Sequence, residues 1–178
     1  MTARDQALSA RVAQAWDVLR GVLDPEVPAI SVTDLGIVRD VVEHDDGLEV
    51  LVTPTYSGCP ATEVIEQAIA DALAAAGLGR VRVTQRRAPA WTTDWITPQG
   101  RENLRAYGIA PPGACAGAAA PGKDAANVQP IRLMARDVAC PRCGSARTER
   151  LSAFGSTACK SLYRCIECRE PFEHFKPI

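Results

Sequence analysis

Two Cys-x-x-Cys pairs near the carboxyl end are the strongest constraint on how this chain can fold. Cys140 and Cys143 form one pair and Cys165 and Cys168 the other, with 21 residues between Cys143 and Cys165. Each pair can reach one metal from a tight turn, and two such turns on facing hairpins complete a tetrahedral site of four thiolates. The spacing therefore predicts a β-ribbon around one metal, with Zn²⁺ as the expected ion and rubredoxin-like iron as the alternative.

We expect this metal to be structural, because four thiolates leave no open coordination position. A unit of about 50 residues cannot build a sufficient core alone, so metal binding and folding should be coupled. Cys159 lies between the pairs and is either a buried strand residue or a reactive thiol beside Lys160. His174 follows the second pair, and packing explains it more simply than ligation, since four cysteines already fill the metal's shell.

Cys59 is a separate candidate, in the run Thr53-Pro54-Thr55-Tyr56-Ser57-Gly58-Cys59-Pro60. Alternating apolar residues precede this run and a helical pattern follows it, so Cys59 should lie where a strand ends and a helix begins, with Pro60 at the first helical position. Free backbone N–H groups and a positive dipole end are expected there, which would make the thiol acidic, reactive or metal-binding. The alternative is a small buried apolar residue at a helix start.

The apolar pattern of the first 110 residues predicts the element order α-β-β-α-β-α. Helices are expected over 5–23, over 61–76 and from Thr93 or Asp94 to Gly108, and strands near 37–42, 48–52 and 81–85. This order predicts an α+β domain with a small mixed three-stranded sheet. The expected domains are thus 1–110, an Ala/Gly/Pro-rich linker at 111–128 that contains Cys115, and the zinc ribbon at 129–178.

Charge and hydropathy restrict the class of protein. Residues 1–129 hold 11 Lys and Arg against 16 Asp and Glu, whereas residues 130–178 hold 9 against 5. The two parts therefore have different surfaces, and neither has the dense basic stripe of a nucleic-acid-binding protein. No apolar run is long enough to span a bilayer, and the first residues lack the apolar core of a secretory signal. We expect a soluble, cytoplasmic protein without membrane or nucleic-acid partners.

Trp91 and Trp95 lie four residues apart, followed by Ile96 and Thr97. Aromatic side chains dominate both cores and interfaces, so the pair indicates either core packing or an interface. Asp34, Asp94 and Glu63 are acidic residues that the fold could bring to Cys59, although the sequence alone does not place them.

Several runs together resemble known families. Asp24-Pro25-Glu26-Val27-Pro28, Thr33-Asp34-Leu35-Gly36, the Cys59 run and Trp91-Thr92-Thr93-Asp94-Trp95-Ile96-Thr97 resemble the metal–sulfur cluster assembly domain of iron–sulfur maturation factors. Their combination with Cys140-Pro141-Arg142-Cys143-Gly144-Ser145, the Phe154-to-Lys160 run and Cys165-Ile166-Glu167-Cys168 resembles the PaaD family of phenylacetyl-CoA epoxidase subunits. The resemblance covers nearly the whole chain except the linker.

The resemblance implies an accessory role in aerobic phenylacetate degradation, with the oxygenase and reductase subunits of the epoxidase as partners. It implies that Cys59 is the functional thiol, supported by Asp34 in the same set of motifs. The chain carries no di-iron Glu-x-x-His set, dinucleotide loop or ferredoxin-type cysteine spacing of its own. The resulting hypothesis is a non-catalytic maturation subunit in which Cys59 transiently holds iron or an iron–sulfur cluster. A homodimer would bring two Cys59 thiolates together.

Three rival hypotheses follow from the same residues. Cys59 could be the nucleophile of a thiol enzyme, although no histidine base is placed for it. The ribbon could bind nucleic acid through its positive charge. The chain could be a purely structural subunit of the epoxidase complex, indifferent to replacement of Cys59.

Overall fold

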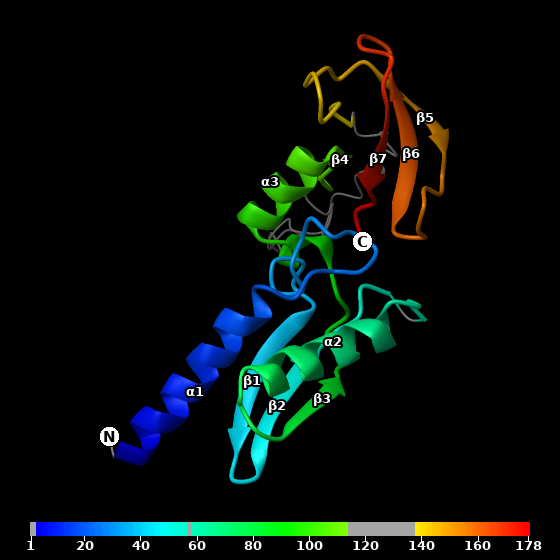
Figure 1. Ribbon diagram of the computed structural model, residues 1–178. Helices are drawn as coiled ribbons and strands as arrows, with labels where there is room; N and C mark the ends of the chain where they lie inside the picture. Colours follow the sequence, from blue (N-terminus) through cyan, green and yellow to red (C-terminus); the bar gives the residue numbers. More distant parts are fainter. Residues whose placement is uncertain (1–2, 57, 114–137) are drawn as a thin grey trace, which may run out of the picture. The chain divides into compact units, whose positions relative to one another are not determined.

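The computed structural model describes residues 3–56, 58–113 and 138–178, and the chain divides into two compact units between Leu104 and Arg105. Figure 1 shows the elements of both units. Most of the predicted linker, including Cys115, lies outside the described residues. None of the helices in the described ranges is long and apolar enough to cross a membrane.

A three-stranded mixed sheet organises the first unit. Strands β1 (Val38–His44) and β2 (Gly47–Val52) form an antiparallel hairpin, and β3 (Val81–Gln85) lies parallel to β2, in the order β1-β2-β3. The parallel register pairs Val52 with Gln85, so β2 and β3 end at the same edge of the sheet. This register places whatever follows β2 next to whatever follows β3.

Two helices pack on this sheet. Helix α1 (Ala3–Leu19) contacts β1 and α2, and α2 (Thr62–Ala75) contacts β3 as the crossover between the parallel strands. Helix α2 buries one face at helical spacing through Ile65, Ile69 and Leu73. These side chains and the inner faces of the strands form the core, which confirms the predicted α+β class and its mixed three-stranded sheet.

The third helix differs from its expected start. Residues Thr93–Trp95 make only one 3-10 turn (η1), and α3 begins later and spans Pro98–Tyr107. Pro98 is favoured at a first helical position because the backbone N–H that it lacks would have no helical partner there. The prediction of a helix from Thr93 or Asp94 was therefore wrong by about one turn.

The second unit is a four-stranded sheet in the order β4-β7-β6-β5. Its strands are β4 (Ile109–Ala110), β5 (Thr148–Ser152), β6 (Lys160–Cys165) and β7 (Pro171–Phe175). Strands β5, β6 and β7 are antiparallel neighbours, whereas β4 pairs with β7 in parallel. Residues 109 and 110 were expected in the first domain, but their backbone pairs with β7 and extends this second sheet. Two residues are too few to show a strand period.

Candidate metal and thiol sites

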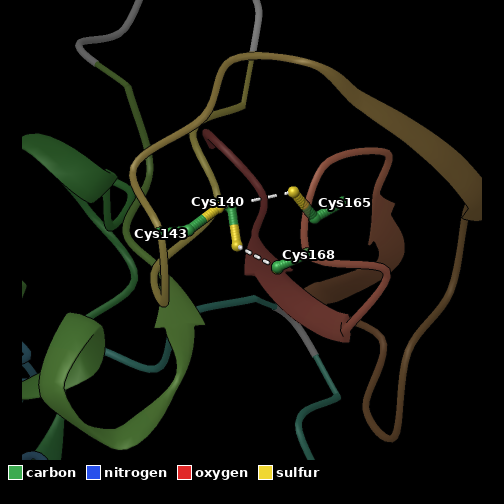
Figure 2. Close-up of side chains that lie close together, drawn as sticks. All are labelled: Cys140, Cys143, Cys165 and Cys168. Carbon is green, nitrogen blue, oxygen red and sulfur yellow. Dashed lines mark hydrogen bonds between the residues drawn. The ribbon is translucent and has the colours of Figure 1, made fainter.

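The four knuckle cysteines converge on one point in the second unit (Figure 2). Their sulfur atoms all lie within 4.8 Å of one another, with 3.7 Å between the Sγ atoms of Cys140 and Cys168 and 3.5 Å between those of Cys143 and Cys165. A Zn–S distance of about 2.3 Å places the sulfur atoms of a regular tetrahedron about 3.8 Å apart. The four thiols therefore have the spacing that a tetrahedral metal ion requires.

The turns after the cysteines direct backbone N–H groups at the sulfur atoms. The backbone N–H of Cys168 stabilises the thiolate of Cys165 and lowers its pKa to about 7. The backbone N–H of Glu170 acts in the same direction on Cys168, but burial and the adjacent sulfur atoms outweigh it and raise the pKa of Cys168 to about 12. Crowded thiols resist carrying four negative charges together, so this donor set fits a central divalent cation.

Neither Cys159 nor His174 belongs to this group of ligands. Cys159 is 6% exposed and its Sγ lies 3.1 Å from Thr157 Oγ1. It is therefore buried as expected, but it lies in the turn just before β6 and not in the strand. His174 is also buried, with its ring edge-on to Tyr163 and its Nδ1 3.4 Å from Ser161 Oγ. Burial lowers the pKa of His174 to about 4, so the ring is neutral near pH 7.

Cys59 lies in the first unit, in the turn between β2 and α2. Its backbone N–H donates to Tyr56 O, and its carbonyl accepts from Thr62 N. Helix α2 begins only at Thr62, so the prediction of Pro60 at the first helical position was wrong by two residues. The helix starts later because the chain first makes a turn around Cys59, held by these two hydrogen bonds. Ala61 at the N-cap provides no side-chain hydrogen bond, so no side chain caps the start of the helix.

The Cys59 side chain is half-buried and lines an open cavity of about 470 Å³. The polar lining comes from Thr62 and Glu63 of α2 and from Gln85 and Arg87 at the end of β3. Among the described residues, neither the Arg87 guanidinium nor the Glu63 carboxylate makes an ion pair or hydrogen bond. The cavity thus offers a thiol, a cation and a carboxylate, and it is much larger than the ~30 Å³ of one water molecule.

Gln85 and Arg87 were not assigned to the Cys59 site, although the order of the elements gave a signal for them. A strand–helix–strand unit with parallel strands brings both carboxyl ends to one edge of the sheet. Arg86 N donates to Val52 O, which fixes the end of β3 beside the segment that leads to Cys59. Glu63, in contrast, was named as an acid that could approach Cys59, and it lines the same cavity.

Asp34 has both carboxylate oxygens engaged within the first unit. Oδ1 accepts a 2.7 Å hydrogen bond from Thr97 Oγ1, and Oδ2 accepts one of 3.0 Å from Ser31 Oγ. The side chain does not line the Cys59 cavity. A link to the Cys59 segment runs through the backbone, because Ile37 O accepts from Thr53 N at 2.8 Å. This geometry suits positioning of the loop better than direct ligation.

The two tryptophans have different environments. Trp91 is only 4% exposed and its Nε1 donates to Leu35 O, so it packs in the core of the first unit, which was one of the two alternatives. Trp95 is half-buried, with the Arg39 guanidinium 3.6 Å from its ring centroid.

Comparisons with known proteins cover both units. The iron-sulfur cluster assembly protein family matches residues 13–84, and the PaaD zinc beta ribbon domain family matches residues 125–176. A protein of Escherichia coli (strain K12), named as a putative subunit of 1,2-phenylacetyl-CoA epoxidase, is 48% identical over 168 residues, which are 94% of this chain and 94% of that protein. This chain belongs to the PaaD family of epoxidase subunits. The resemblance in the sequence motifs is confirmed over nearly the whole length.

A solved structure shows the same fold for the first part of this PaaD family member. The domain of unknown function DUF59 from Bacillus anthracis covers 56% of this chain and 96% of its own chain, with a TM-score of 0.53 and 21% sequence identity. Together with the family matches, the geometry separates two kinds of thiol. Four cysteines form one compact group suited to a resident metal, whereas Cys59 opens onto a cavity.

Proposed function

We propose that this chain is an accessory subunit that helps load iron or an iron–sulfur cluster into the oxygenase or reductase component of phenylacetyl-CoA epoxidase. The name of the Escherichia coli relative supplies the enzyme complex, and the iron-sulfur cluster assembly family supplies the kind of cargo. Cys59 is the proposed transfer ligand. The observation that carries this proposal is its half-exposed thiol on an open cavity at the start of α2.

The surroundings of Cys59 suit temporary rather than permanent metal binding. Cys59 is the single cysteine among residues 1–104, so one chain offers one thiolate there and the remaining ligands must come from elsewhere. A metal held by one protein thiolate is released more easily than one enclosed by four. The Arg87 guanidinium, which has no partner among the described residues, and the start of α2 both favour an anionic cargo in the cavity.

The transfer step is a ligand exchange without a change of oxidation state. The Cys59 thiol releases its proton to solvent when Sγ binds iron. A ligand from the receiving component then forms its bond to the same iron, the Fe–Sγ bond breaks, and Cys59 takes up a proton again. Asp34 is a supporting residue in this scheme, because its bonds to Ser31 and Thr97 hold the loop that contacts Thr53.

We assign a structural Zn²⁺ to Cys140, Cys143, Cys165 and Cys168, whose four-sulfur geometry fits that ion. When bound, the ion holds the two knuckles together and supplies folding energy to the second unit. Because the donor set is closed, we place no transfer step there. The second unit is then free to serve as the part of the chain that contacts the receiving component.

We further propose that the chain is not itself an enzyme. No histidine lines the Cys59 cavity among the described residues, and the nearest candidate in sequence, His44, bonds Glu49 with its Nε2 3.0 Å from Glu49 Oε2. A thiol enzyme would need a base within hydrogen-bond reach of Sγ. A homodimer joined through shared cargo would supply a second Cys59 thiolate, and sedimentation with and without iron tests this point.

The decisive experiment is anaerobic reconstitution of the zinc-loaded protein with iron and sulfide. We expect wild type and Cys159→Ser to take up iron equally, whereas Cys59→Ser loses most of the uptake while keeping its zinc. Cys159→Ser is the matched control because it removes a buried thiol from the other unit. Equal iron uptake by Cys59→Ser and wild type would defeat the proposal.

Transfer is tested with the metal-free oxygenase and reductase components. Iron-loaded wild type should restore metal content and epoxidase activity in one of them, and the Cys59→Ser protein should not. If components made without this chain are already fully loaded with metal, its role is structural and the maturation proposal fails. A covalent adduct of phenylacetyl-CoA on Cys59, detected by mass spectrometry, would instead support a thiol enzyme.

A further inference from the structure

Phe154 is the most exposed of the large apolar side chains in the described ranges, at 65%. It lies in the loop 153–159 that joins β5 to β6 in the second unit, and neither the zinc site nor Cys59 uses it. Neighbouring Leu151 is 49% exposed as well. Single exposed apolar residues are ordinary on a surface, so the meaning of Phe154 depends on how its loop is held.

The loop is fastened to β7 through Glu173. Lys160, whose side chain is only 3% exposed, places its Nζ 2.9 Å from Glu173 Oε2, and the other oxygen of Glu173 accepts from the backbone N–H of Ser156. Gly155 N donates to Lys160 O at 2.8 Å. A Cβ on Gly155 would lie 2.5 Å from Glu173 Oε1, so a side chain there would have to displace the end of this carboxylate.

Lys176 holds the loop a second time, from just beyond β7. Its backbone N–H donates to Cys159 O at 2.9 Å, and its Nζ donates to Ala153 O at 3.3 Å. The same Nζ lies 4.6 Å from the centroid of the Phe154 ring. The residues on both sides of Phe154 are therefore hydrogen-bonded to β7 or to the residue that follows it. Phe154 is exposed because the backbone of its loop is held in this position.

The ion pair between Lys160 and Glu173 contributes position more than stability. Burying a lysine costs desolvation energy that its partner only partly offsets, and apolar replacements of buried pairs are often no less stable. The hydrogen bonds of Glu173 instead set the path of Gly155 and Ser156. Because the backbone on both sides of Phe154 is already held in place, docking would cost less loop-ordering entropy, which favours Phe154 as an interface anchor.

The charges around Phe154 indicate the kind of partner. We define the Phe154 surface as Phe154 and Lys176, whose Nζ lies over the ring. Arg150 and Leu151, on the strand that leads into the loop, are also exposed, and Arg150 pairs with no carboxylate among the described residues. Seven Lys and Arg stand against four Asp and Glu in residues 138–178. An apolar ring beside cations complements an apolar pocket rimmed by carboxylates.

Pairing through the backbone of β5 fits this surface less well. Strand β5 is at the edge of its sheet, but its register with β6 shifts between Arg150 and Ser152. Such a bulge interrupts the flat ladder that an added strand would need. The side chain of Phe154 is therefore the anchor, with Lys176 as the cation beside it.

We propose that the Phe154 surface docks this chain onto the metal-receiving component of the epoxidase, with the Phe154 ring in an apolar pocket rimmed by carboxylates on that protein. The inference rests on the proposed function for the identity of the partner. It deepens that function by naming the residues of the second unit that recognise the partner and the chemistry of the pocket that receives them.

The test measures binding of the zinc-loaded full chain to the purified oxygenase and reductase components, each immobilised separately. We expect Phe154→Ala to bind one component about tenfold or more weakly than wild type. Leu23→Ala is the matched control, because it truncates a 49% exposed apolar side chain in the first unit, and its affinity should stay within about twofold of wild type. Lys176→Gln should slow association and weaken its salt dependence.

Glu173→Gln tests whether the affinity depends on how the loop holds the Phe154 ring, because the ring itself is kept. This variant keeps Phe154 but loses the charged partner of Lys160, so its affinity should fall between those of wild type and Phe154→Ala. The inference is overturned if Phe154→Ala binds as tightly as wild type, if neither component binds wild type, or if a single-stranded oligonucleotide competes for the surface. Iron uptake is scored separately: it should depend on Cys59 and not on Phe154, so failure of docking leaves the transfer proposal standing.

Discussion

Thr97 Oγ1 donates a 2.7 Å hydrogen bond to Asp34 Oδ1, joining two segments 63 residues apart. The same Thr97 oxygen accepts from Gly100 N at 2.9 Å, so it also caps the start of α3. One hydroxyl thus connects the loop before β1 to the helix after β3. Two motifs that are distant in the sequence, Thr33-Asp34-Leu35-Gly36 and Trp91 through Thr97, are parts of one contact.

A double-mutant cycle tests this connection. Thr97→Ala removes the helix cap and one bond to Asp34, and we expect it to lower the free energy of unfolding by about 2 kcal/mol. Asp34→Ala should cost a similar amount. Because both substitutions break the same bond, the double variant should cost about 1 kcal/mol less than the sum. Urea unfolding followed by tryptophan fluorescence measures these values; additive effects would show that the two residues are not coupled.

The sequence predicted the elements of the first unit because each carries its own period. Helix α2 repeats apolar residues at helical spacing and β2 alternates beside its hairpin turn, and both patterns are local. Helix ends were less predictable, since Pro60 is compatible with a first helical position and also with the turn that the chain makes there.

Contacts between distant segments could be predicted only in part. The four knuckle cysteines were predicted as one group because ligand spacing reflects the geometry of a metal ion. Arg87 was not assigned to the Cys59 cavity, because only the strand–helix–strand order, and no pattern in its local sequence, indicates that β3 lies parallel to β2. The fixed loop around Phe154 depends on Glu173, 19 residues further along the chain, and no local pattern reports such a pairing.

Gly36 should be the least replaceable residue of its loop. Its φ is 75°, and a Cβ there would lie 2.8 Å from both the Cβ and the carbonyl oxygen of Trp95. Gly36→Ala should therefore lower the free energy of unfolding by about 3 kcal/mol, combining backbone strain and overpacking. Gly77→Ala is the control, with φ 73° and nothing within 4 Å of the added Cβ, and should cost only about 1 kcal/mol. If both variants lose the same unfolding free energy, Trp95 can move aside and the overpacking at Gly36 costs nothing.

Removal of the metal should unfold the second unit alone. All three tryptophans, Trp16, Trp91 and Trp95, lie in the first unit, so their fluorescence reports on that unit only. A strong chelator should abolish the protection of the strand amides in residues 138–178 against hydrogen exchange. It should leave the tryptophan emission unchanged. Cys143→Ser should reproduce this state without chelator, whereas Cys159→Ser should not. Protected amides in a metal-free second unit would contradict the coupling of folding to metal.

The buried ring of His174 should make the second unit sensitive to acid. Burial lowers the pKa of His174 from 6.5 to about 4, so the unfolded chain binds a proton at a higher pH than the folded chain does. Stability from this group is therefore complete above pH 6.5 and declines as the pH falls toward 4. We expect a loss of about 2 kcal/mol by pH 5, close to the integral of this difference in proton binding.

His174→Gln isolates that contribution, because it replaces the ring with a neutral polar side chain. Protonation of the metal-binding thiols also destabilises the unit in acid, but it acts on both proteins alike. The zinc-loaded wild type and His174→Gln are compared by guanidinium unfolding at several pH values between 7 and 5. Hydrogen exchange of the β6 and β7 amides monitors the unfolding. Wild type should lose about 2 kcal/mol more than His174→Gln over this interval. Parallel stability profiles would show that the ring can take up a proton without disturbing its contacts with Tyr163 and Ser161.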